Sequence, residues 1–317
     1  MKKLIVMLLA LVLVASCSMA VAENWPPQTI NMIVTHGAGG DTDYNARLIS
    51  RLLEEKLGVT IAVSNVTGSN GNIALAQYKD GDNSGNTFVF TNTSALTGNE
   101  VTGVSDISYE DFEPVAIYGR QSGENIIVPA DAPYNTLGEL IEASKANPGS
   151  IRFGISTGGG VYIAATLLTY AGGAQFNVID EGDAAQRLTA LLGDHVDATI
   201  VPYANIGEYI EAGQIKALCT LLDTPPALIP DIPSASETVP EVVINTNYAC
   251  LAPKGTDPAI VEALNAAILD IVYNSAEYKE EVNNYNKQEP WALNVEETIE
   301  SLKEQRDLFM QYIDYLQ

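Results

Sequence analysis

Twice along the chain, a short apolar run ends in a glycine-rich turn that leads directly into a helical pattern. The first run, residues 29–35, is followed by His36-Gly-Ala-Gly-Gly40, and the second, residues 151–156, by Thr157-Gly-Gly-Gly160. Such turns expose backbone N–H groups beside the positive end of a helix dipole, which together favour an anion. The duplication predicts two α/β units whose turns face each other across a cleft, although each glycine could serve only to close its turn.

The rest of the sequence alternates short apolar runs with helical patterns, which is typical of an α/β fold. Further strands are expected at 60–64, 87–91, 176–179 and 196–201. Helices are expected up to Leu57 ahead of Gly58, up to Tyr78, from Thr136 to Lys145, at 161–170 and 184–192, from Pro258 to about Tyr273, and from Asn294 nearly to Gln317. Asp257 before Pro258, and Asn294 three residues before Glu297, are the start signals of the last two helices.

The N-terminus predicts export. Two lysines precede an uncharged run from Leu4 to Ala15, as in a secretory signal, and this run is too short for a comfortable membrane span. Two cleavage sites are possible. Cleavage before Cys17, at a lipobox, would leave this cysteine lipidated at the mature N-terminus, whereas cleavage after Ala22 would release a soluble chain. We favour the lipoprotein, because a cysteine directly after Val-Ala-Ser is uncommon by chance. In either case the mature chain is expected outside the cytoplasm, in the periplasm or on the outer cell surface.

The charge balance excludes one class of partner. Forty acidic residues against sixteen basic ones give a net charge of −24, which repels phosphate backbones, so no nucleic-acid partner is expected. Cys219 and Cys250 lie in apolar runs and are expected to be core residues more than a disulfide. The cysteines and the two histidines lack the spacing of metal ligands, so no metal or cofactor is expected.

Several short strings occur in the order found in a known family. They are Ile33–Asp43 with Ala46-Arg47, Asn65–Ile73, Asp111–Val115, Thr136–Leu140, Asn147–Gly149, Leu191–Asp197, Pro225–Pro240 and Leu251–Thr256. From about Trp25 onward the chain thereby resembles the solute-binding receptors of tripartite tricarboxylate transporters, also called Bug receptors. The resemblance implies an α/β fold of the periplasmic-binding-protein (Venus flytrap) type, with a hinge between two lobes. We expect a signal region at 1–22, one lobe at 23–122 plus about 246–317, and a second lobe at about 123–245.

The resemblance also implies which residues hold a carboxylate ligand between the lobes. On the first lobe these are His36, Gly37, Ala38, Gly39, Gly40, Asp41 and Asp43, with Thr93 and Ser94 after the strand at 87–91. On the second lobe they are Ser156, Thr157, Gly158, Gly159, Gly160 and Asp183. Asp43 is expected to brace its loop more than to touch the ligand, whereas His36 either contacts the ligand or packs at the base of the loop.

The chain departs from the family pattern at Asp180-Glu181-Gly182-Asp183, where the family often has a basic residue. Carboxylates beside an anionic ligand weaken its binding, and more so when water leaves the cleft. Three interpretations stay open. The acidic residues face solvent or cap the helix at Ala184, the ligand carries an amino group or other cation beside its carboxylate, or a bound cation bridges them.

The expected function is a receptor that closes on a small carboxylate-bearing metabolite, with amino acids among the candidates, and delivers it to membrane permease subunits. A ligand sensor that feeds a signalling system needs the same cleft and is the alternative. A secreted serine hydrolase is a more distant one, since Gly154-Ile-Ser-Thr-Gly158 fits G-x-S-x-G. His195 follows Ser156 too closely for the hydrolase order, so we expect no enzyme.

Overall fold

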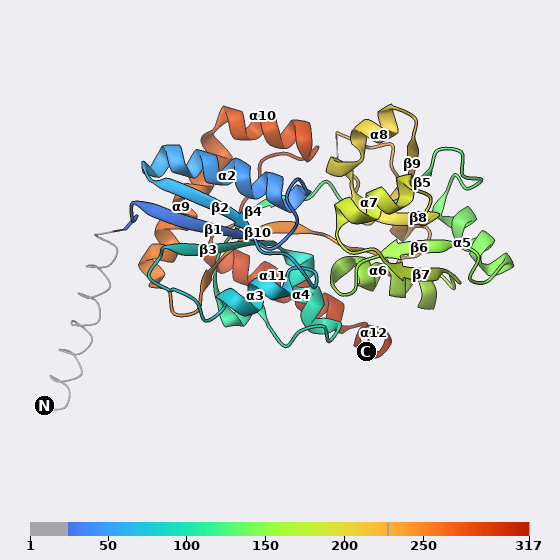
Figure 1. The fold of residues 1–317 in the computed structure, drawn as a ribbon, viewed down its shortest axis with the longest axis horizontal. Coiled ribbons are helices and arrows are strands. Elements are labelled where there is room, and N and C mark those ends of the chain that lie inside the picture. The colour runs from blue at the N-terminus through green and yellow to red at the C-terminus, as the bar shows by residue number, and fades with distance from the viewer. Residues whose placement is uncertain (1–24, 227, 317) are drawn as a thin grey trace, which may run out of the picture.

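The computed structural model describes residues 25–226 and 228–316, which form two lobes side by side, each with its own sheet (Figure 1). The expected signal region and Cys17 lie outside the described residues. Each lobe has a five-stranded sheet covered by helices on both faces. The predicted α/β architecture of two lobes is confirmed.

The first lobe is built on the strand order β2-β1-β3-β10-β4. Its strands are β1 (Thr29–Val34), β2 (Thr60–Asn65), β3 (Thr87–Asn92), β4 (Phe112–Arg120) and β10 (Asn247–Pro253). Along β1, Ile30 and Met32 pack on one face with α2 (Asp41–Leu57), α9 (Pro258–Asn274) and α10 (Ala276–Tyr285). Ile33 points to the other face, with α3 (Asn72–Tyr78), α4 (Thr93–Val101) and α11 (Val295–Met310). The alternation of side chains along a strand thus produces two cores in one lobe.

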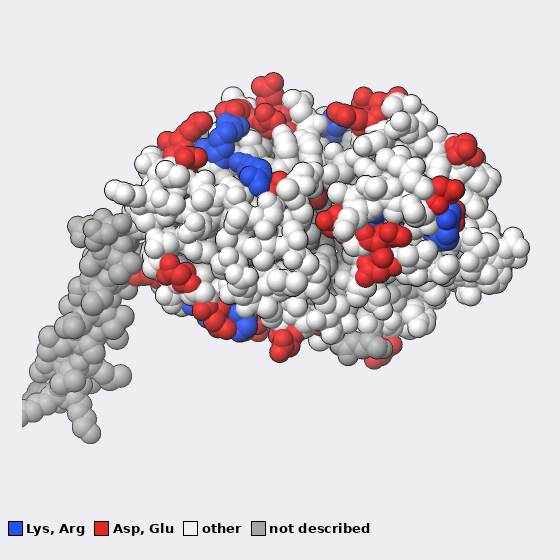
Figure 2. Space-filling view, in the orientation of Figure 1, with Lys and Arg blue, Asp and Glu red and all other residues white. Residues whose placement is uncertain are grey.

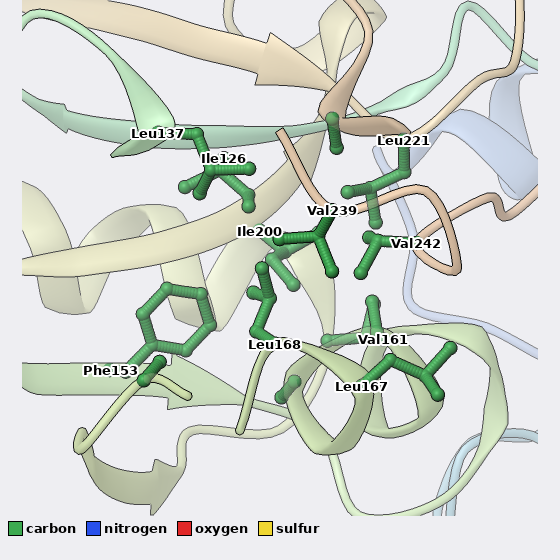
Figure 3. Close-up of a cluster of buried hydrophobic side chains, with 14 of the residues drawn as sticks. Ile126, Leu137, Phe153, Val161, Leu167, Leu168, Ile200, Leu221, Val239 and Val242 are labelled. Carbon is green, nitrogen blue, oxygen red and sulfur yellow. The ribbon is translucent and has the colours of Figure 1, made fainter. Parts of the chain in front are cut away.

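The second lobe has the order β7-β6-β8-β5-β9. Its strands are β5 (Glu124–Pro129), β6 (Arg152–Ile155), β7 (Asn177–Asp180), β8 (Ala198–Pro202) and β9 (Ile215–Thr220). Helices α5 (Leu137–Ala146) and α6 (Gly159–Tyr170) cover one face, where the cluster in Figure 3 lies, and α7 (Ala184–Leu192) and α8 (Gly207–Glu211) cover the other. In that cluster, Phe153 of β6 and Ile200 of β8 pack against Leu168 of α6.

Both sheets share one strand pattern. Three parallel strands in the order second-first-third are followed by one antiparallel strand and an edge strand. The edge strand β4 leads across the hinge into β5, and the edge strand β9 leads back into β10. The duplication predicted from the two glycine turns is therefore confirmed in the topology.

The hinge segments between these strands are joined by backbone hydrogen bonds. The N–H of Gln121 donates to the carbonyl of Thr246 at 3.0 Å, and the N–H of Leu221 donates to the carbonyl of Glu124 at 2.7 Å. The N–H of Ile244 donates in turn to the carbonyl of Leu221 at 2.7 Å. The two crossings thus run together as one connection between the lobes.

The helix signals in the sequence are confirmed at most ends. Gly58 ends α2 in the left-handed conformation, Asp257 caps α9 ahead of Pro258, and Asn294 and Glu297 form a capping box on α11. The last helix is shorter than predicted, since it breaks after Met310 and resumes as α12 (Ile313–Leu316). The break lets the C-terminal turn fold onto the second lobe.

Phe309 and Leu316 are buried in the core of the second lobe, although α11 covers the first sheet.

The helices α4 and α10 were not predicted. In α4 the sequence Thr-Ser-Ala-Leu-Thr-Gly-Asn-Glu-Val has an interior glycine and little amphipathic pattern, and it is buried almost all round.

Cys219 and Cys250 are both buried and form no disulfide in the part of the chain that the structure describes, and burial raises the pKa of each thiol. Within the described ranges no single helix is long and apolar enough to cross a bilayer, although α9 and α10, bent by 75° at their junction, meet the length and composition test as a pair.

One prediction concerns the packing of α11 on β4, where the pairing with β10 is irregular. The N–H of Ile117 donates to the buried hydroxyl of Thr298 at 2.9 Å. Thr298→Val keeps the shape but leaves this N–H without an acceptor, so we expect the free energy of unfolding to fall by about 1–3 kcal/mol in urea titrations. Thr298→Ser keeps the acceptor, so its free energy of unfolding should fall less than that of the valine variant. Equal stability of the valine variant and the parent would contradict this role.

Candidate functional site

A cavity of about 40 Å³ lies between the two lobes, at the carboxyl ends of β1, β3 and β6. It is lined by His36, Asp41, Asn70, Asn92, Ser94, Gln121, Glu124, Ser156, Gly160, Val161, Asp183, Ala184 and Arg187. Figure 2 shows the cleft between the lobes, with acidic side chains gathered beside it on the second lobe. Ligands of α/β folds bind at such carboxyl ends, which makes this cavity the candidate site.

A larger groove of about 760 Å³ runs along the hinge between Arg120, Leu222 and Trp291. None of its described lining residues belongs to the first turn of a helix. It therefore lacks the feature that distinguishes the smaller cavity.

The feature that distinguishes the smaller cavity is that four helices begin at it. Asp41 is the first residue of α2, Ser94 the second of α4, Gly160 the second of α6 and Ala184 the first of α7. The N–H groups of a first helical turn have no acceptor within the helix and carry the positive end of its dipole. The cavity is thus surrounded by partial positive charge from both lobes, which suits a carboxylate.

The first glycine turn is held in place by its own hydrogen bonds. The N–H of Gly39 donates to Asp43 at 3.0 Å, and the N–H of Gly40 donates to the carbonyl of Gly37 at 3.3 Å. Asp43 also accepts from Arg47 and Asn65. Burial raises the pKa of Asp43, but the bonds from Arg47, Gly39 and Asn65 together hold this pKa below its usual range. Asp43 therefore braces the loop as an ionised carboxylate.

The second glycine turn permits a close contact between the lobes. A Cβ on Gly98 of α4 would lie 2.7 Å from the Cα of Gly159, and a Cβ on Gly160 would lie 3.0 Å from the Cβ of Ser94. A Cβ on Gly159 would meet the amide of Asn70 at 2.2 Å. Side chains at these positions would separate α4 from α6, so the glycines here serve close packing as well as the turn.

The structure brings part of the predicted set to the cavity: His36, Asp41, Ser94, Ser156, Gly160 and Asp183. Gly37 lies against Asp183, since a Cβ on Gly37 would be 2.7 Å from the Asp183 Oδ2. The residues expected at the site that do not line the cavity are Ala38, Gly39, Gly40, Asp43, Thr93, Thr157, Gly158 and Gly159. Ala38 and Gly39 are exposed, and the Thr93 hydroxyl accepts from the N–H of Asn247.

Sequence reasoning missed seven lining residues: Asn70, Asn92, Gln121, Glu124, Val161, Ala184 and Arg187. Arg187 lies on a helix with an ordinary amphipathic pattern, and its place at the cavity follows from the direction of α7. Gln121 and Glu124 lie in the hinge. The polar stretch Gln121-Ser-Gly-Glu124 between two apolar strands was the signal that could have found them.

His36 is held as a neutral imidazole. Its Nε2 lies 3.2 Å from the amide nitrogen of Asn92, and its Nδ1 lies 2.7 Å from the Thr35 hydroxyl, which donates to Thr91 at 3.0 Å. Because the Thr35 proton is used, Nδ1 carries the ring proton and Nε2 accepts. Burial lowers the pKa of His36, although Asp41, Asn70 and Asp183 act in the opposite direction.

Arg187 and Glu124 face each other in the cavity wall. Arg187 is 3% exposed, and it donates from Nε to the carbonyl of Ile200 and from Nη1 to the carbonyl of Gly182, both at 2.8 Å. Its Nη2 lies 3.9 Å from the Oε2 of Glu124, which is too long for a hydrogen bond. Burial raises the pKa of Glu124 to about 7, because Arg187 only partly offsets the loss of solvent.

The acidic segment at residues 180–183 divides into two parts. Asp183 caps α7 through a capping box with Gln186, as one interpretation of the sequence expected, and it also borders the cavity. Asp180 accepts from the Thr157 hydroxyl and from the N–H of Gly182, and neither Asp180 nor Glu181 lines the cavity.

The residues of the hydrolase motif do not come together. Ser156 lines the cavity, whereas His195 is exposed on the turn after α7. The start of α7 lies at the cavity, so His195 is about one helix length away, on the order of 13 Å for nine residues.

Residues 45–315 match the model of the family described as "Tripartite tricarboxylate transporter family receptor". Protein BugT of Bordetella pertussis is 30% identical over 260 residues, which cover 80% of this chain and 79% of that protein.

Two solved structures from Rhodopseudomonas palustris share the fold. One, with adipate, has a TM-score of 0.84 and 22% identity over 92% of this chain and 98% of the other. The other, MatC with bound malate, has a TM-score of 0.80 and 21% identity over 92% of this chain and 100% of the other.

A second prediction follows from the raised pKa of Glu124. Between about pH 4.3, where an unfolded chain releases this proton, and about 7, the folded protein keeps it, so stability falls as pH rises. Glu124→Gln removes the titration. We expect its stability relative to the parent to increase by roughly 2–3 kcal/mol from pH 5 to pH 8, measured by urea unfolding. His36 is present in both proteins, so its titration does not contribute to the difference in stability between them. A difference between the two that is constant with pH would contradict the raised pKa.

Proposed function

The chain belongs to the tripartite tricarboxylate transporter receptor family, and we propose that it captures a small carboxylate-bearing metabolite between its lobes and delivers it to the membrane subunits of such a transporter. A solute-binding receptor performs no chemical step on its ligand. The observation that carries the proposal is the convergence of four helix N-termini on one cavity between the lobes. Adipate and malate, held by two proteins of the same fold, are consistent with a carboxylate.

The proposal assigns the carboxylate to groups on both lobes. Ser94 and Ser156 offer hydroxyls, and the first turns of α4 and α6 offer N–H groups. Arg187 offers the Nη2 edge of its guanidinium. A ligand that touches both lobes binds the closed arrangement better than the open one, so its binding energy shifts the population toward closure. The closed form is then the one that docks on the transporter.

The lobe bounds proposed from the sequence, 23–122 with about 246–317 and about 123–245, place each sheet within one lobe. The C-terminal turn, with Phe309 and Leu316, packs on the second lobe and forms a further tie between the two. Anchoring through Cys17, outside the described residues, belongs to the same proposal and would keep the receptor beside its transporter.

A screen of ligands tests the proposed function directly. A ligand that binds only the native state stabilises it by about 2.7 kcal/mol at a hundredfold excess over its Kd, so the Tm must rise. We expect at least one of a panel of small carboxylates that includes malate, succinate and adipate, or an amino acid, to raise the Tm. The corresponding amides, which carry no carboxylate, should leave it unchanged. Equal shifts with acids and amides, or none with any of them, would sink the proposal.

A further prediction concerns closure. Gly98→Ala places a methyl group against the backbone of Gly159, so the approach of α4 to α6 is disfavoured. The same change favours α4 itself by up to about 1 kcal/mol. We therefore expect at least tenfold weaker binding of the best ligand with no loss of stability in its absence. The radius of gyration from X-ray scattering should decrease less on ligand addition than in the parent.

The matched control is Gly138→Ala, in α5 of the second lobe, where a Cβ has no neighbour closer than 3.9 Å. It should bind as the parent does. If both alanine variants bind equally well, the glycine contact has no part in closure.

A further inference from the structure

The charges around the cavity are unfavourable for a simple dicarboxylate. Asp41, Glu124 and Asp183 line it, against the single guanidinium of Arg187. His36 adds no positive charge, because burial lowers its pKa. A dianion enclosed here would lie beside several carboxyl groups in a space with little water, where like charges repel strongly. The helix N-termini and Arg187 can hold one carboxylate. The acidic side chains that line the cavity favour a ligand that also carries a positive charge.

Two buried acceptors in the cavity wall have no donor. Among the described residues, the Oε1 of Gln121 and the Oε2 of Glu124 are buried and accept no hydrogen bond. The two residues are 2% and 8% exposed. The amide of Gln121 is oriented by its Nε2, which donates to the Oδ2 of Asp41 at 2.8 Å, so its oxygen cannot exchange places with the nitrogen. The large majority of buried acceptors in proteins accept a hydrogen bond. These two do not, and both border the cavity.

An ammonium group matches these acceptors. It carries three N–H donors and one positive charge, whereas a plain carboxylate brings only further acceptors. A metal ion fits less well, since no three His, Cys, Asp or Glu side chains in the described part of the chain are grouped to hold one. The cavity holds a few water-sized volumes, which favours a compact ligand.

We propose that this receptor selects a small carboxylate that also bears a protonated amine, as in an α-amino acid. Glu124 and the Gln121 carbonyl oxygen bind the ammonium group, with Asp41 and Asp183 in support. Arg187 and the helix N-termini bind the carboxylate. The inference rests on the proposed function, because it names the substrate class of the same cavity.

The pH dependence of binding differs in sign between the two ligand classes. Glu124 faces Arg187 from α7 and Asp41 from α2, and it shares the cavity with Asp183 and with His36. An ammonium group favours ionised Glu124, which has a pKa of about 7, so affinity for an amino acid should fall as pH decreases from 8 to 6. A dicarboxylate favours protonated Glu124, and its affinity should rise over the same interval.

The experiment compares matched pairs by titration calorimetry on the protein: L-alanine with propionate, L-aspartate with succinate, and L-glutamate with glutarate. In at least one pair we expect the amino acid to bind ten times tighter or more than its analogue without the amine, and to weaken as pH falls. Tighter binding of the plain acid, or stabilisation by calcium alone, would overturn the inference and leave the receptor function standing. If none of the six acids, malate or adipate binds, the proposed function fails as well.

Variants locate the ammonium site. Glu124→Gln removes the charge with little change of shape and should weaken the amino acid at least tenfold, while the plain acid binds as well or better. Glu181→Gln makes the same chemical change one loop away, outside the cavity, and should bind as the parent does. Equal losses for both members of a pair in Glu124→Gln would show that the residue only supports the fold, and a loss in Glu181→Gln alone would move the cation to the outer rim.

Discussion

Gly98 in α4 and Gly159 at the start of α6 meet with no side chain between them, and this backbone contact sets how near the two lobes can come. Because the helices approach so closely, their N-termini point into one shared cavity with those of α2 and α7. The hinge strands then place Gln121 and Glu124 in the wall of the same cavity. The size and the enclosure of the site therefore depend on this approach between the two glycines.

The sequence was informative wherever structure is local. A strand that ends in a glycine turn predicts a helix N-terminus. Ser156, at the end of a predicted strand, and His36, Ser94 and Asp183, which follow predicted strands, do reach the cavity. Gln121 and Arg187 could not be predicted in the same way. The position of Gln121 depends on how β4 crosses between the sheets, and that of Arg187 depends on which face of α7 packs inward. Such information lies in tertiary packing and not in spacing along the chain.

The acidic segment after β7 left an unusual ligand as one of three interpretations, but Asp180 and Glu181 do not line the cavity. Asp180 shapes the loop through Thr157 and Gly182, and only Asp183 borders the cavity. The acidic character of the interior comes mainly from Asp41 and Glu124, which are far apart in sequence and belong to the other lobe and to the hinge. Because these carboxyl groups are buried, their charges are screened less than those of the many acidic residues at the surface, which are in contact with water.

The two crossings at the hinge also determine the order in which the chain can complete its sheets. All five strands of the second sheet lie between residues 124 and 220, so this sheet is built from one uninterrupted stretch of the chain. The first sheet begins at Thr29 but lacks the strand between β3 and β4 until Asn247–Pro253 has emerged during synthesis. The sheet that starts first is therefore finished last, and the edges of β3 and β4 stay open while the second sheet is made.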